Sequence, residues 1–245
     1  KPIVFYRSGL GPFRRKLSRW LVHIILKRTV LFIARDPETR DLALSLGCRK
    51  ERTVLGIDPV CSWQENDEKE GDRGKRIAIF VREGMNEKKD LVLEGVHRLK
   101  EKTPCEVEFV AFHRQSDESV ASHFAEASGA QWRYFHSPEE IWTYFSHLSA
   151  VFTMRLHPAV IASVMGVPWF AFDIDPKIIS FSGLWGGTNL IHWQELSVDT
   201  FWERYTRRDE ICPTLSTLAQ TIQERTRESE ESLENFIEAI WGSRS

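Results

Sequence analysis

The sequence predicts an α/β protein built on parallel sheets. Apolar runs of strand length recur along the chain, and the segments between them carry apolar residues at helical spacing. This alternation is typical of strand–helix units on a parallel sheet. The six runs are residues 2–6, 30–34, 77–81, 107–112, 150–153 and 168–172. A chain of 245 residues with 42% hydrophobic side chains can form one large or two small domains.

The first helix is expected within residues 13–29. Its apolar residues recur at helical spacing and form one face, with the arginines on the other; they are Phe13, Leu17, Trp20, Leu21, Ile24 and Ile25. Residues 1–30 hold eight Lys or Arg and no Asp or Glu, although the net charge of the chain is −2. We expect the basic face to be a solvated surface, with peripheral contact to an anionic membrane as the alternative. The near-neutral total gives no support for a nucleic-acid partner.

Later helices are indicated by their start and stop signals. Asp36-Pro37 predicts a helix start and Gly47 its end. Helices near 87–102 and 117–128 follow, and Asp117 is expected to cap the second. Pro158 is expected to begin a helix, and residues 213–241 to form a long helix with one apolar face.

Residues 64–75 contain no apolar side chain and are expected to form a linker. We therefore expect one domain over 1–63, a second over 76–195, and C-terminal helices over 196–245 that pack back on the domains.

Four cysteines at long, unequal spacings predict reduced thiols. No apolar run approaches the ~20 residues that cross a bilayer, which favours a cytoplasmic protein, with membrane association as the alternative.

Candidate functional residues follow the predicted strands. In parallel α/β sheets, ligands bind beyond the carboxyl ends of the strands, near helix N-termini. Arg35, Arg82 and Arg155 each follow a strand. The guanidinium fork suits a phosphate or carboxylate, so three such residues around one cleft would favour an anionic substrate. Each one alone is equally well explained as a surface cation or a structural ion pair.

Five further residues lie at strand ends. His157 is placed to transfer a proton at the helix start beside Arg155, or simply to complete that turn. Lys177 can face the cleft, whereas Asp175 is suited to cap a helix before Pro176. Gly9 and Gly11 bring backbone close to a ligand or form a tight turn. No metal-binding, P-loop or G-x-S-x-G pattern occurs, so we expect neither a metal nor a cofactor.

Residues 153–168, which read TMRLHPAVIASVMGVP, and residues 170–177, which read FAFDIDPK, resemble the polysaccharide pyruvyl transferase family. Members carry a similar MRLH…GVP…YDPK stretch. Four other segments resemble family motifs in the same order: Tyr6–Pro12, Phe32–Thr39, Gly56–Pro59 and Ile77–Arg82. The family's Gly-rich opening has no counterpart, so we expect the first domain to be truncated at its N-terminus.

This resemblance implies two Rossmann-like domains, similar to the GT-B glycosyltransferases. It also implies transfer of the pyruvyl group of phosphoenolpyruvate to a sugar hydroxyl pair, on a cell-surface polysaccharide or its precursor, lipid-linked acceptors included. His157 would then be the general acid/base, and Arg155 with Arg35 or Arg82 would hold the anions. Lys177 would neutralise developing phosphate charge, while Gly9, Gly11 and Asp175 would contact substrate.

Two alternatives remain at this point. The first is a GT-B-like glycosyltransferase that uses a nucleotide sugar, because a cleft with Arg and Lys also suits a diphosphate. The second is a truncated relative that binds ligand without turnover.

Overall fold

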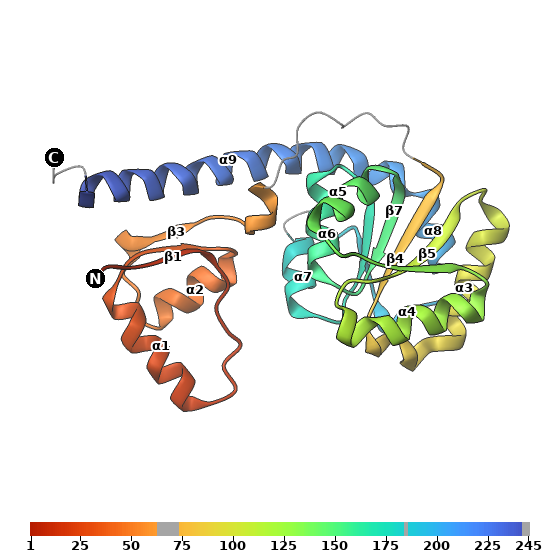
Figure 1. The fold of residues 1–245 in the computed structure, drawn as a ribbon, viewed down its shortest axis with the longest axis horizontal. Coiled ribbons are helices and arrows are strands. Elements are labelled where there is room, and N and C mark those ends of the chain that lie inside the picture. The colour runs from red at the N-terminus through yellow and green to blue at the C-terminus, as the bar shows by residue number, and fades with distance from the viewer. Residues whose placement is uncertain (63–73, 184–185, 242–245) are drawn as a thin grey trace. The chain divides into compact units, whose positions relative to one another are not determined.

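The computed structural model describes residues 1–62, 74–183 and 186–241, with the backbone alone for 62, 212–219 and 240–241 (Figure 1). It divides into two compact units, each described by itself. Unit 1 comprises Lys1–Gln64 and Gln220–Ser245, and unit 2 comprises Glu65–Ala219. Most of the expected linker 64–75 lies outside the described residues. Both units are parallel sheets with flanking helices, which confirms the predicted fold class.

Unit 1 is built on a three-stranded parallel sheet of order β1-β2-β3. Its strands are β1 (Ile3–Ser8), β2 (Thr29–Ala34) and β3 (Thr53–Leu55), and its helices are α1 (Lys16–Arg28), α2 (Pro37–Ser45), η1 (Lys50–Arg52) and η2 (Pro59–Ser62). The predicted start of α2 is confirmed, because the Asp36 carboxylate accepts a hydrogen bond from the Thr39 backbone N–H at 2.7 Å. Sequence reasoning missed β3, whose three half-buried residues are too few to show a period.

The apolar face of α1 is turned away from the core of unit 1, contrary to the usual behaviour of an amphipathic helix. Leu26 is the only buried residue of α1, and it packs in a cluster with Phe32 and Ala43. Leu17 and Trp20, on the opposite side of the helix, are 65% and 57% exposed. The sequence pattern identified the apolar face correctly but does not state which side of the helix meets the sheet.

Unit 2 is built on a six-stranded parallel sheet of order β6-β5-β4-β7-β8-β9. The strands are β4 (Arg76–Val81), β5 (Glu106–Ala111), β6 (Gln131–Tyr134), β7 (Leu148–Thr153), β8 (Trp169–Phe172) and β9 (Leu190–Ile191). The chain starts at the central β4, adds β5 and β6 on one side, and returns to the other side of β4 for β7 to β9. This doubly wound order places the topological switch point between β4 and β7, where such sheets bind ligands.

Helices flank the sheet of unit 2, and its strands are packed with aromatic side chains. The helices are η3 (Glu83–Lys88), α3 (Lys89–Lys102), α4 (Arg114–Ser128), α5 (Pro138–Ser146), α6 (Leu156–Val164), α7 (Pro176–Gly183), η4 (Trp193–Glu195) and α8 (Thr200–Thr206). Phe80, Phe109, Phe152 and Phe170 are almost completely buried, one from each of four neighbouring strands. The short outer strands β6 and β9 were not predicted, since β6 is mostly exposed and β9 has two residues.

Two predicted helix starts in unit 2 are wrong by a few residues. α6 begins at Leu156 with Arg155 as its N-cap, so Pro158 is its third residue. A proline is tolerated there, because the first N–H groups of a helix have no intrahelical acceptor. α4 begins after His113, and Asp117 lies inside its first turn, where the carboxylate accepts a hydrogen bond from the His113 backbone N–H at 3.0 Å.

The long C-terminal helix is confirmed as α9 (Arg208–Trp241), which starts earlier than expected. Its part from Gln220 onward belongs to unit 1. There Arg7, at the end of β1 and 2% exposed, donates hydrogen bonds to the Ser229 hydroxyl at 3.0 Å and the Thr226 carbonyl at 2.7 Å. A buried cation thus joins α9 to the sheet of unit 1.

Candidate functional site

The candidate site of unit 2 lies at the carboxyl edge of its sheet, at the switch point between β4 and β7. A surface pocket of about 830 Å³ opens there. Arg82 after β4, Met154 after β7 and Asp173 after β8 all contribute to its wall. Strand ends that are remote in sequence therefore meet in one place, as the parallel sheet predicts.

Three of the predicted residues lie together at this edge. The Arg82 guanidinium is 3.7 Å from the Asp175 carboxylate. Asp175 also accepts a hydrogen bond from the Lys177 backbone N–H at 2.9 Å, so it caps α7 as expected. Arg82 and Asp175 are each 36% exposed, and Lys177 is exposed. Two cations thus flank the N-terminus of α7 and remain accessible to solvent.

Arg155 has a different environment. Its Nε and Nη2 donate hydrogen bonds to the Asp117 carboxylate, and Nη2 also donates to the Ser116 hydroxyl at 3.0 Å. Asp117 is completely buried. The Thr153 hydroxyl, also buried, accepts from the Arg155 N–H and donates to the Arg155 carbonyl, both at 2.8 Å. The structural ion pair considered for Arg155 is therefore present, and its partner is the residue that was expected only to cap a helix.

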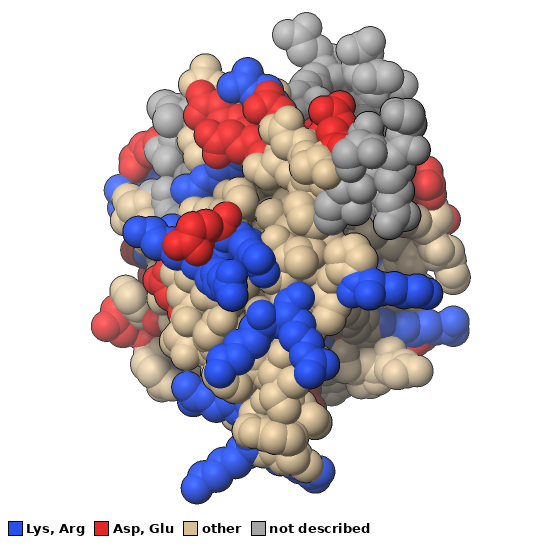
Figure 2. Space-filling model, turned by 90° about the vertical axis from the view of Figure 1, so that its left-hand side faces the viewer, with Lys and Arg blue, Asp and Glu red and all other residues tan. Residues whose placement is uncertain are grey.

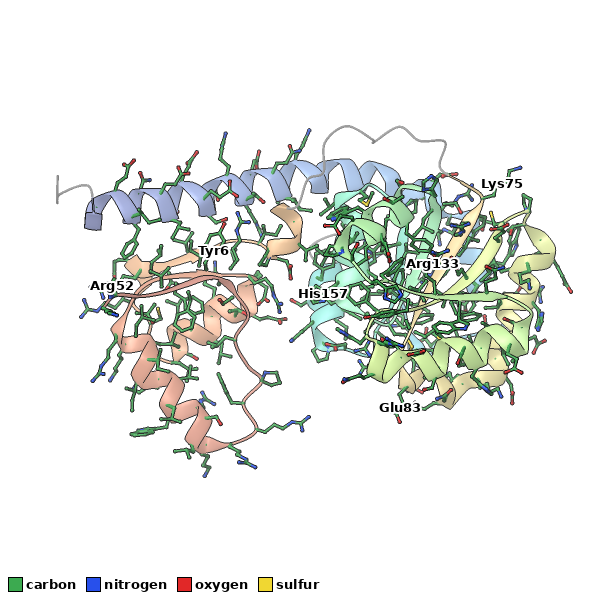
Figure 3. The ribbon with its side chains drawn as sticks, viewed as in Figure 1. Tyr6, Arg52, Lys75, Glu83, Arg133 and His157 are labelled. Atoms are coloured by element: carbon green, nitrogen blue, oxygen red, sulfur yellow. The ribbon has the colours of Figure 1, made fainter. Side chains whose placement is uncertain are left out.

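His157 is the second residue of α6 and is half-buried (Figure 3). Its ring stacks on the Phe112 ring at the end of β5, with centroids 6.0 Å apart and planes 15° apart. This stacking orients the imidazole at the carboxyl edge of the sheet. Sequence reasoning missed Phe112 because the contact joins two strand ends that are far apart in the chain.

A second histidine near the pocket was also missed. The His192 Nδ1 lies 2.8 Å from the Asp173 carboxylate, which also accepts from the Trp193 backbone N–H at 2.7 Å. The hydrogen bond to Asp173, and then the negative charge of Asp173, raise the pKa of His192 above its ordinary value of 6.5. No sequence spacing indicates this pair, because β9 alone brings His192 back beside β8.

The charges around the pocket have mixed sign. Arg82 contributes a cation, whereas Glu83, Glu87 and Asp173 contribute carboxylates to the same wall. Carboxylates are good acceptors for hydroxyl donors, while the guanidinium is suited to an anion. Such a wall is able to hold a ligand that carries both hydroxyl groups and negative charge.

The other predicted residues belong to unit 1. The Arg35 guanidinium, after β2, lies 3.3 Å from the Asp36 carboxylate and 3.5 Å from that of Asp58. A side chain at Gly9 would place its Cβ 2.9 Å from the Arg35 Nη2, and Gly11 has φ +80°, a conformation that favours glycine. Gly9 thus lets the Arg35 side chain lie against the backbone, and Gly11 fits the turn considered after β1; contact of either glycine with a ligand stays a prediction. That Arg35 lies in one cleft with Arg82 and Arg155 stays a prediction.

Other chemical features of the described residues are few. None of their His, Cys, Asp and Glu side chains form a group of three or more that could hold a metal ion. Cys48, Cys61 and Cys105 are free thiols, and burial raises the pKa of Cys61 to about 12. Among the helices that the structure describes, none is long and apolar enough to span a bilayer.

Comparison with known proteins identifies the family. The family model described as polysaccharide pyruvyl transferase matches residues 1–176 of the 245. No curated protein matches the chain.

Three solved structures illustrate the fold. A protein assigned as a UDP-N-acetylglucosamine 2-epimerase from Listeria monocytogenes has a TM-score of 0.71 and 13% identity, over 98% of this chain and 68% of that one. The UDP-GlcNAc 2-epimerase from Neisseria meningitidis, bound to UDP-GlcNAc, has a TM-score of 0.67 and 12% identity, over 97% and 69%. A mutant of S. aureus TarM in complex with UDP has a TM-score of 0.59 and 11% identity, over 96% and 49%. These likenesses establish a fold of the GT-B type.

Proposed function

Because the chain belongs to the polysaccharide pyruvyl transferase family, we propose that it transfers the pyruvyl group of phosphoenolpyruvate to two hydroxyls of a sugar. The product is a ketal on a cell-surface polysaccharide or its precursor. The observation that carries this proposal is that Arg82, Lys177 and His157 all follow strands at the carboxyl edge of one sheet, where Arg82 lines a pocket together with carboxylates.

Phosphoenolpyruvate carries a carboxylate and a phosphate, and accessible cations are needed to bind it. Arg82 and Lys177 supply them at the N-terminus of α7, where the helix dipole also favours an anion. Arg155 acts as a positioning residue in this scheme, because its Nε and Nη2 are already bonded to Asp117 and Ser116. Arg35 remains the candidate from unit 1 for a further contact with the donor.

The reaction needs a proton donor and a site for two hydroxyls. His157 protonates the methylene carbon of phosphoenolpyruvate, and a first sugar hydroxyl attacks the oxocarbenium-like carbon that results. The second hydroxyl then displaces phosphate. One hydroxyl proton replaces the proton that His157 gave up, and the other leaves with phosphate. The carboxylates of Glu83, Glu87 and Asp173 can accept hydrogen bonds from the sugar hydroxyls in the pocket.

A test on His157 separates chemistry from binding. We expect His157→Ala to abolish phosphate release from phosphoenolpyruvate in the presence of a panel of monosaccharide glycosides, while calorimetry still detects phosphoenolpyruvate binding. His136→Ala, which removes an exposed loop histidine of the same unit, is the control and should leave both readouts unchanged. Unchanged turnover in His157→Ala would remove this residue from the mechanism.

A nucleotide-sugar transferase is the second candidate. It is favoured by the complexes with UDP-GlcNAc and UDP among the similar structures. Calorimetric titration of the full chain with phosphoenolpyruvate, UDP and UDP-GlcNAc distinguishes the two. Heat from phosphoenolpyruvate supports the pyruvyl transferase, and heat from the uridine nucleotides alone would contradict it.

A further inference from the structure

The helix α1 presents a stripe of large apolar side chains to solvent. Leu17, Trp20, Leu21 and Ile25, named here the α1 stripe, are 65%, 57%, 47% and 40% exposed. Their spacing of i, i+3, i+4 and i+8 places them on one side of the helix. Four large apolar residues at one place on a surface are unusual in a soluble chain and indicate an interaction site.

The orientation of α1 is held by contacts on its other side. Leu26 is 1% exposed in the core cluster of unit 1, and Val22 packs against that cluster. The His23 Nδ1 lies 2.8 Å from the Leu46 carbonyl oxygen. Because these contacts tie the inner side of the helix to unit 1, the α1 stripe faces outward in the folded chain.

The charged side chains of α1 and of the segment before it are all cations. The first acidic residue of the chain is Asp36, and the last turn of α1 contains Lys27 and Arg28. Figure 2 shows Lys and Arg side chains projecting from the lower half of this face, and Asp and Glu mainly in its upper half. The ion pairs between described residues include none of the Lys or Arg of α1 or of the segment before it: Arg14, Arg15, Lys16, Arg19, Lys27 and Arg28.

We infer that the α1 stripe docks on the surface of an anionic lipid bilayer. Trp and Leu side chains enter the boundary between headgroups and acyl chains, and neighbouring Lys and Arg attract anionic headgroups. A second copy of the chain is a poorer occupant, because pairing of two such faces would bring their cations together. The helix has 13 residues and lies flat on the surface.

The docking surface is separate from the proposed reaction, since no residue of the α1 stripe is given a part in that reaction. It would nevertheless hold the enzyme at the place where a lipid-linked acceptor is found. Cosedimentation of the full chain with phosphatidylcholine vesicles, with and without phosphatidylglycerol, tests the proposal. We expect binding only to the anionic vesicles, and weaker binding at high salt.

Two sets of variants test the two parts of the surface. Leu17→Ser/Trp20→Ser/Leu21→Ser removes the apolar contact, and Lys27→Glu/Arg28→Glu reverses the charge. Each cation near an anionic surface contributes about five-fold in binding, so the charge variant should bind at least ~25-fold more weakly. Matched controls in unit 2 are Trp132→Ser, which replaces an exposed aromatic residue, and Lys89→Glu/Lys102→Glu on α3; both should bind as the unaltered chain does.

Three results would overturn the proposal. They are equal binding to neutral and anionic vesicles, full binding by the serine variant, and a concentration-dependent dimer in light scattering that the serine variant abolishes. Phosphoenolpyruvate calorimetry on the same variants separates this proposal from the proposed function. A stripe variant that loses vesicle binding but still binds phosphoenolpyruvate supports the docking role of the α1 stripe and leaves the proposed function unaffected.

Discussion

Two neighbouring strands of the unit 2 sheet end in arginines whose surroundings differ. After β7, Arg155 is bonded to the completely buried carboxylate of Asp117. After β4, Arg82 lies 3.7 Å from Asp175, and both side chains are 36% exposed. The same residue type at equivalent positions therefore has a structural role in one place and is available to a ligand in the other. Burial of the carboxylate partner makes this difference.

The largest expected effect is on stability, at Arg155. Arg155→Met leaves Asp117 buried without its cation, so we expect the free energy of unfolding to fall by about 3–5 kcal/mol. Urea unfolding followed by circular dichroism measures this change. The double variant Asp117→Asn/Arg155→Met removes both charges and should recover part of the loss. A change below about 1 kcal/mol in Arg155→Met would show that the two arginines do not differ in this way.

At Arg82 we expect the opposite result, with little effect on stability and a larger effect on ligand binding. Arg82→Gln breaks an exposed ion pair, so the free energy of unfolding should change by less than about 1 kcal/mol. Loss of a charged contact to the donor should weaken phosphoenolpyruvate binding about ten- to a hundredfold in calorimetry. The control is Arg114→Gln, which alters an exposed arginine of the same unit and should leave binding unchanged. Unchanged phosphoenolpyruvate affinity in Arg82→Gln would place the donor elsewhere.

The smallest expected effect concerns His192 and pH. Its pKa is raised by the hydrogen bond to Asp173 and by the charge of that carboxylate. The protonated ring therefore contributes stability that is fully present below 6.5 and is lost as the pH rises through the higher folded pKa. An NMR titration of His192 should have its midpoint above 6.5, and Asp173→Asn should lower it. A midpoint at 6.5 in the unaltered chain would contradict the hydrogen bond between His192 and Asp173.

Much of the local structure was predictable because it depends on short-range signals. Asp36 before Pro37 marks a helix start, since a capping carboxylate and a proline both suit the first turn. Arg82, Arg155 and Arg35 were found at strand ends because apolar runs define where buried strands stop. The short strands β3, β6 and β9 were not found, since they lack a long enough apolar run to show a period.

Partners across the sheet were not predictable from a single chain. Asp117 is 38 residues from Arg155, and His192 is 19 residues from Asp173. Nothing at either position indicates a partner at that separation. Only the order of the strands brings these side chains together: β4 lies between β5 and β7 for the first pair, and β9 lies beside β8 for the second.

The sequence by itself determined the α/β class, the main strands, most helix ends and the family resemblance, because these depend on periodicity and on residues close together in the chain. The tertiary structure alone decided which arginine is tied to a buried carboxylate and which is accessible. It also decided that the apolar face of α1 points to solvent. Packing between segments remote in the chain decides which side chains are buried. Burial in turn decides whether a charge needs a partner, and whether an apolar side chain is removed from water.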